Sequence, residues 1–88
     1  MENDETWELL SYILASQYRK KILKVLLNGP TIPKEIAKKT DLRISHVSAV
    51  LKDLSRKELV ECITPKARKG RIYRVTEKGK ALIEKINK

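Results

Sequence analysis

The sequence is poor in the residues that build metal, cofactor and catalytic sites. Its 88 residues include one cysteine, Cys62, and one histidine, His46. Neither has companions at the spacing of a zinc site, and His46 has no partners in a nucleophilic or paired-carboxylate arrangement. The three glycines are too scattered for a nucleotide-binding phosphate loop. We therefore expect no metal, no cofactor and no enzymatic activity.

Long hydrophobic runs are also missing. No segment approaches the ~20 apolar residues that cross a bilayer, so we expect no membrane partner. Residues 1–8 carry four acids and no base, unlike the basic start of a secretory signal. A single cysteine excludes an intrachain disulfide and favours a reducing compartment. These absences predict a cytoplasmic protein in which Cys62, within the apolar run LVECI, is a small core residue.

Positive charge is what the sequence has in excess. Lysine and arginine total 20 against 11 acidic residues, which gives a formal net charge of +9. So basic a chain favours a polyanionic partner, although a ribosomal protein or a solvated lysine-rich surface has the same balance. With 41% hydrophobic residues, the chain predicts one globular domain over 1–88. A domain this small buries a modest core, which favours a partner subunit.

Helical spacing dominates the first two thirds of the chain. Apolar residues recur every three or four positions over 6–27, with a break near Ser16, which is placed to cap a second helix. An Asn-Gly-Pro triplet ends this segment. Pro33 is suited to the first turn of a short helix that ends near Thr40. A further helix is expected to begin at Ser45, whose hydroxyl can accept from a free backbone N–H.

The last two of these helices have the layout of a helix-turn-helix unit over about 33–56. Val47, Leu51 and Leu54 form one apolar stripe along the second helix. This stripe predicts an outward face formed by His46, Ala49, Val50 and Asp53. Many compact helical proteins contain such a pair, so the pair needs a second feature to indicate a DNA-binding protein.

That second feature is a basic hairpin. The β-rich stretches LVECIT and RIYRVT predict a hairpin over about 59–76, and Thr76 caps a last helix over about 77–87 in which Gly79 permits close packing. The hairpin tip carries Lys66, Arg68, Lys69 and Arg71. Crowded cations repel one another unless phosphates neutralise them. Because the basic hairpin and the helix-turn-helix pair occur together in one short chain, we favour phosphate binding over an edge hairpin kept soluble by charge. The predicted fold class is α+β, a winged helix-turn-helix with three to four N-terminal helices, a two-stranded hairpin wing and a C-terminal helix.

A family resemblance covers nearly the whole chain. The run IPKEIAKKTDLRISHVSAVLKDLSRKELVECITPKARKGRIYRVTEKGKALIE is similar to the small archaeal winged-helix regulators related to the ArsR and MarR families. The segments VECITP and KGRIYRVTEKG carry the most specific match. The resemblance implies a dimeric, sequence-specific DNA-binding protein with its recognition helix at Ser45–Arg56, its wing at Lys66–Arg71, and its N- and C-terminal helices at the dimer interface.

Two features depart from the family pattern. Family members often carry Arg or Gln on the exposed recognition face, whereas this chain has Ala49 and Val50, which can touch thymine methyl groups but form no bidentate hydrogen bonds. The cysteine-rich ligand sets of metal-sensing ArsR proteins are also missing, so we expect no metal response.

These observations assign roles to three sets of residues. The DNA bases are expected to face Ser45, His46, Ser48, Ala49 and Val50. The DNA backbone is expected to be held by Arg43, Lys52, Lys66, Arg68, Lys69 and Arg71. The dimer interface is expected to comprise Trp7, Leu10, Leu14, Leu82 and Ile86. The N-terminal members, Trp7, Leu10 and Leu14, are equally consistent with ordinary core packing.

The predicted function is a transcriptional regulator that binds double-stranded DNA as a homodimer. Two alternatives stay open. A winged helix that binds RNA would have the same basic charge. A protein-interaction module of the transcription machinery would use the outward helix face against a partner, and the apolar Ala49 and Val50 suit that use.

Overall fold

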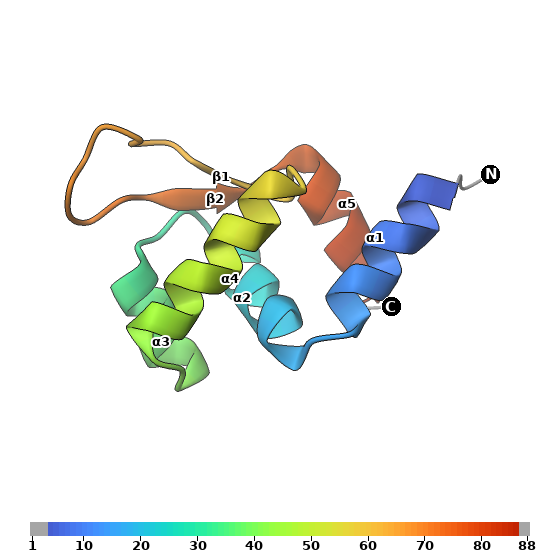
Figure 1. The fold of residues 1–88 in the computed structure, drawn as a ribbon, viewed down its shortest axis with the longest axis horizontal. Helices are drawn as coiled ribbons and strands as arrows, with labels where there is room; N and C mark the ends of the chain where they lie inside the picture. The colour runs from blue at the N-terminus through green and yellow to red at the C-terminus, as the bar shows by residue number, and fades with distance from the viewer. Residues whose placement is uncertain (1–3, 87–88) are drawn as a thin grey trace.

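A computed structural model describes residues 4–86 (Figure 1). Its elements, in chain order, are α1 (Asp4–Leu14), α2 (Gln17–Leu27), α3 (Pro33–Thr40), α4 (Ile44–Arg56), β1 (Val60–Cys62), β2 (Tyr73–Val75) and α5 (Glu77–Ile86). Within this part of the chain, helices precede and follow one antiparallel hairpin. The α+β winged helix-turn-helix predicted from the sequence is confirmed.

The break between α1 and α2 lies where the sequence predicts it. Ser16 is extended, and its hydroxyl accepts a hydrogen bond from the Arg19 backbone N–H at 3.4 Å. The Arg19 side chain then reaches back to α1, where it donates to the Tyr12 carbonyl at 2.6 Å and lies 3.7 Å from the centre of the Tyr12 ring. These contacts cap α2 and hold it at a defined angle to α1.

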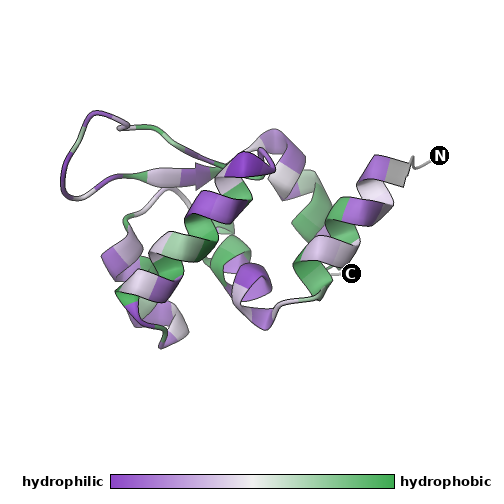
Figure 2. Cartoon of the chain, viewed as in Figure 1, coloured by the Kyte–Doolittle hydropathy of each residue, from purple (hydrophilic) through white to green (hydrophobic). Residues whose placement is uncertain are grey.

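The core draws apolar side chains from all five helices and from β1. Ile22, Leu23 and Leu26 of α2 are almost fully buried, and the other helices and the hairpin pack around this face. Figure 2 shows hydrophobic residues on α1 and α5 where these helices face each other. Burying such side chains is the main term that stabilises a domain of this size.

The hairpin is attached to the helices at its base. Val60 pairs with Val75 and Cys62 with Tyr73, so each strand has only three residues. Thr31, in the loop between α2 and α3, exchanges two backbone hydrogen bonds with Tyr73, at 3.0 and 2.8 Å. This pairing holds the hairpin beside the start of α3. Cys62 is half-buried and is not one of the buried core residues.

The start of α5 has the predicted Thr76 cap and the predicted close packing at Gly79. The Thr76 hydroxyl accepts from the Gly79 backbone N–H at 3.0 Å and donates to the Glu58 carbonyl at 2.7 Å. A Cβ on Gly79 would collide with the Leu59 carbonyl oxygen, so glycine is required for this close approach. The Thr76 cap and the close approach at Gly79 together hold α5 against the end of the hairpin.

Candidate nucleic-acid interface

The turn between α3 and α4 comprises residues 41–43. Asp41 adopts a left-handed conformation with φ of 60°, and the Leu42 backbone N–H donates to the Ala37 carbonyl at 3.1 Å. Arg43 is extended and precedes the first helical residue, Ile44, with no side-chain cap. The prediction that α4 begins at Ser45 with a hydroxyl cap is therefore wrong, because the tight turn at Asp41 brings the chain into helix one residue earlier.

The face of α4 opposite the core is exposed along its length. Val47, Leu51 and Leu54 are fully buried, which confirms the predicted apolar stripe. At about 100° per residue, the opposite face is formed by Ser45, Ala49, Lys52 and Arg56, and all four are exposed. Arg56 was not among the predicted site residues, although the helical spacing that selects Ala49 and Lys52 also selects it. Its guanidinium lies 3.5 Å from the Asp53 carboxylate, an exposed pair that binds weakly.

Two residues predicted to face bases lie on a flank of α4 instead. Val50 is half-buried and packs against the core, so it is not on the outward face. His46 is exposed, but its ring contacts Tyr18 of α2 edge-on, with the ring centres 4.4 Å apart. The cause is the packing of α2 against α4, which widens the covered side of α4 beyond the apolar stripe.

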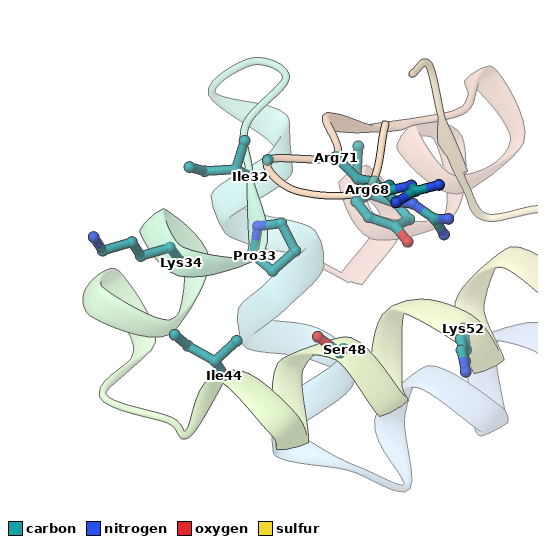
Figure 3. Close-up of a pocket in the computed structure, with 10 residues that line it drawn as sticks. Ile32, Pro33, Lys34, Ile44, Ser48, Lys52, Arg68 and Arg71 are labelled. Carbon is teal, nitrogen blue, oxygen red and sulfur yellow. The ribbon is translucent and has the colours of Figure 1, made fainter. Parts of the chain in front are cut away.

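The other flank of α4 faces the wing across a pocket of about 440 Å³ (Figure 3). Ile32, Pro33, Ile44 and Tyr73 supply apolar walls, and Ser48 points toward the wing from α4. The pocket also has four basic lining residues: Lys34, Lys52, Arg68 and Arg71. Lys34, Ile44 and Tyr73 were missed from the sequence. Pro33 does indicate that Lys34 lies in a first helical turn, but the proximity of Lys34 to the wing depends on the Thr31–Tyr73 pairing.

Internal hydrogen bonds shape the wing loop, residues 63–72. The Ile72 backbone N–H donates to the Thr64 hydroxyl at 2.8 Å, and the Arg71 Nε donates to the Ala67 carbonyl at 2.8 Å. Gly70, with φ of 64°, supplies the left-handed residue that turns the chain. Arg71 therefore uses one of its donors to hold the loop, and its remaining guanidinium N–H groups can bind a ligand.

The cations of the wing loop form no salt bridge within the described part of the chain. Lys66, Arg68, Lys69 and Arg71 are all exposed. In residues 4–86, none of these cations lies in a salt bridge with a carboxylate. Arg43 and Lys52, predicted to hold the DNA backbone from the helix-turn-helix unit, are likewise exposed and outside these salt bridges. The wing and α4 thus present unpaired positive charge on both sides of the pocket.

The predicted dimer residues divide between core and surface. Leu10 and Leu82 are 7% and 4% exposed, so they belong to the core of the chain itself, because α1 packs directly on α5. Trp7 and Leu14 are 60% and 57% exposed, and Ile86 is half-buried. A groove of about 440 Å³ runs between them, lined by Trp7, Leu10, Ser11, Leu14, Lys20, Lys85 and Ile86. The exposed apolar surface is smaller than the sequence predicted and lies along α1 and the end of α5.

Residues 4–86 contain neither a metal-binding cluster nor a membrane-spanning helix. This part of the chain has no group of three histidine, cysteine, aspartate or glutamate side chains that could hold a metal ion. The described helices are all too short or too polar to span a bilayer.

A tight helix pair, followed by a hairpin that places unpaired cations beside the second helix, defines a winged helix-turn-helix protein. The chain belongs to the winged helix-turn-helix family, whose model matches residues 10–88. No protein of curated function matches the chain in sequence.

Solved structures extend this likeness over almost the whole chain. HlyU from Vibrio cholerae has a TM-score of 0.78 and 27% identity, and the match covers 99% of this chain and 95% of HlyU. The reduced form of the transcriptional regulator YodB from B. subtilis has a TM-score of 0.79 and 28% identity, with 99% and 86% covered. A homodimeric winged helix-turn-helix DNA-binding domain from Mycobacterium bovis, described as a possible ArsR-family transcriptional regulator, has a TM-score of 0.75 and 25% identity, with 98% and 84% covered.

Proposed function

We propose that this chain is a transcriptional regulator that binds double-stranded DNA as a homodimer, with α4 in the major groove and the wing on the phosphates beside it. The observation that carries the proposal is the continuous exposed surface formed by the outward face of α4 and the unpaired cations of the wing. Membership of the winged helix-turn-helix family and the likeness to transcriptional regulators support it.

The outward face of α4 suits a major groove, which is about 12 Å wide and admits one helix. Ser45 offers a hydroxyl to base edges, and Ala49 offers a methyl group that can contact thymine. Ser48 and Ile44 lie on the wing side of the same turns and extend this surface. His46 is proposed to contact DNA from the other flank, and Val50 is left out because it packs against the core.

Phosphates are proposed to bind on the cationic walls around the pocket. Lys34, Lys52 and Arg68 line it from α3, α4 and the wing. Arg43, Lys66, Lys69 and Arg71 extend the positive surface in either direction. Phosphate contacts of this kind position a protein on a duplex without reading its sequence.

The dimer is proposed to form through α1 and the end of α5. Trp7 and Leu14 expose large apolar surfaces that the core of the chain does not cover, and the Mycobacterium bovis neighbour is a homodimer. A small domain gains stability when a second copy covers such surface. The resemblance to archaeal regulators and the cytoplasmic location stay predictions from the sequence.

One selection experiment tests the function. A random duplex library is incubated with the protein, with structured RNA as a competitor, and the bound fraction is sequenced. We expect enrichment of one short motif, repeated with two-fold symmetry if the dimer binds. Preferential recovery of RNA, or no duplex binding even at low salt, would contradict the proposal and favour an RNA-binding or a protein-interaction role.

A further inference from the structure

A second basic surface lies on α2, outside the site described so far. We name it the α2 stripe, and it consists of Gln17, Lys20, Lys21 and Lys24. These positions are spaced three and four residues apart, so they share one face of the helix. They border a depression of about 340 Å³ together with Leu14. Throughout residues 4–86, no carboxylate lies in a salt bridge with any of the three lysines, in contrast to Lys78, which pairs with Glu5.

The α2 stripe lies beside the flank of α4 that faces away from the wing. Tyr18, in the first turn of α2, contacts His46 of α4, with 4.4 Å between ring centres. On α4, Ser48 faces the wing, whereas His46 faces α2. In Figure 1 the wing and the first turn of α2 accordingly lie on opposite sides of α4. At about 100° per residue, Lys21 projects between Gln17 and Tyr18, so among the stripe's lysines it lies nearest α4 around the helix.

The DNA major groove is bordered by phosphates on both of its edges. A helix in the major groove has one DNA strand on each side, and both strands carry phosphates at the groove edges. The wing lies on one side of α4 and faces the phosphates along that edge of the major groove. The other strand therefore lies on the flank where Tyr18 and His46 meet. Among the cations of the α2 stripe, Lys21 lies nearest that flank. Its repulsion from Lys20 and Lys24 in the free protein is relieved when phosphates replace solvent.

We propose that the α2 stripe binds the phosphates of the DNA strand opposite the wing, with Lys21 making the main contact and Gln17 and His46 beside it. This inference rests on the proposed function, since it needs α4 in a major groove. In this arrangement the duplex is held from both flanks of α4, so the register of the helix in the groove is fixed by two backbones instead of one.

The test compares Lys21→Gln with Lys80→Gln, which removes the same charge from an exposed position on α5. Kd for the selected duplex is measured by fluorescence anisotropy from about 50 to about 200 mM salt. Losing one phosphate contact makes the slope of the logarithm of the association constant against log salt less negative by about 0.9. We therefore expect Lys21→Gln to bind more weakly than the wild type at low salt, and the difference to shrink roughly threefold across this range. Lys80→Gln should match the wild type, and Lys21→Arg should restore binding.

Each possible result either supports or overturns the inference that the α2 stripe binds DNA. A salt slope for Lys21→Gln equal to that of Lys80→Gln overturns the inference while leaving the proposed function intact. Sedimentation without DNA provides the second arm: if Lys21→Gln dissociates the dimer, the stripe binds a second copy, for which the exposed Glu8 of α1 has the right charge. Dissociation of the dimer by Lys21→Gln also overturns the inference that the stripe binds DNA. Failure of the wild type to bind any duplex overturns the proposed function itself. Thermal melts confirm that the variants are folded.

Discussion

Ala49 lies at the centre of the outward face of α4, between the exposed Ser45 and Lys52. It carries no hydrogen-bond donor in its side chain, so in the proposed complex only its methyl group is available to the bases. If this face enters the major groove as proposed, the short side chain leaves room for a longer one. The residue therefore offers a direct test of which face of α4 reads the DNA.

Replacing Ala49 with Arg should change the preferred DNA sequence. The guanidinium can donate two hydrogen bonds to a guanine, which is worth about 1–3 kcal/mol of discrimination at one base pair. Stability should barely change, because the position is exposed and arginine is a good helix former. Sequence selection and thermal melts of Ala49→Arg check both parts. An unchanged motif would contradict the placement of Ala49 in the groove.

Leu51→Ala should have the opposite effect. Leu51 is fully buried, and its truncation leaves a cavity that costs about 2–5 kcal/mol of unfolding free energy. Binding should weaken for all DNA sequences alike, through loss of folded protein, with the motif unchanged. Denaturant unfolding and selection on the folded fraction provide the measurement. A stable Leu51→Ala with an altered motif would mean that α4 is rotated from the orientation described here.

At the scale of elements, the wing combines a fixed base with a charged tip. Its base is paired with Thr31, and Thr64 and Arg71 hold the loop through hydrogen bonds to Ile72 and Ala67. The exposed cations at the tip are therefore presented from a loop with a defined shape. Defined placement lowers the entropy lost when these side chains meet phosphates.

Reversing charge at the wing tip should weaken binding without changing specificity. In the double variant Arg68→Glu and Lys69→Glu, repulsion from phosphates should lower the affinity for every duplex and reduce the salt dependence. The double variant Arg68→Lys and Lys69→Arg keeps the charge and should retain most of the affinity. Anisotropy titrations and sequence selection measure these effects. A new preferred sequence in the charge-reversed protein would show that the wing reads bases or groove shape.

For the whole molecule, the proposed DNA-binding face and the apolar groove lie on different elements, whereas the α2 stripe adjoins the groove through Leu14 and Lys20. The wing and α4 present the proposed DNA-binding face, and α1 lies on the far side of α4 from the wing (Figure 1). Trp7, Leu14 and Ile86 line the groove where α1 meets the end of α5. This separation allows one copy to contact DNA and a second copy at the same time. A symmetric dimer would then present two copies of α4 to one duplex.

Leu14→Glu should dissociate the dimer while leaving each subunit folded. Leu14 is 57% exposed in the isolated chain, so the substitution disturbs little of the core but places a charge in the groove. Ile63→Glu is the matched control, because Ile63 is 41% exposed at the start of the wing loop, away from that groove. Sedimentation should detect a dimer for Ile63→Glu and a monomer for Leu14→Glu. A dimer that survives Leu14→Glu would place the interface elsewhere.

Several features were determined by the sequence itself, because they depend on neighbours within one or two turns. The caps at Ser16 and Thr76 form as predicted, whereas Ser45 caps nothing because α4 begins one residue before it. The stripe of Val47, Leu51 and Leu54 follows from helical periodicity. The hairpin follows from a change of period at residue 59. The fold class therefore follows from the sequence.

Other features were decided only by tertiary packing, because they join residues far apart in the chain. Leu10 and Leu82 enter the core since α1 packs on α5, which no local spacing records. Val50 and His46 turn to a flank because α2 crosses beside α4. Lys34 reaches the wing pocket through the pairing of Thr31 with Tyr73. Periodicity states which side of a helix is apolar, but only the packed neighbours determine how much of that side they cover and which exposed residues they bring together.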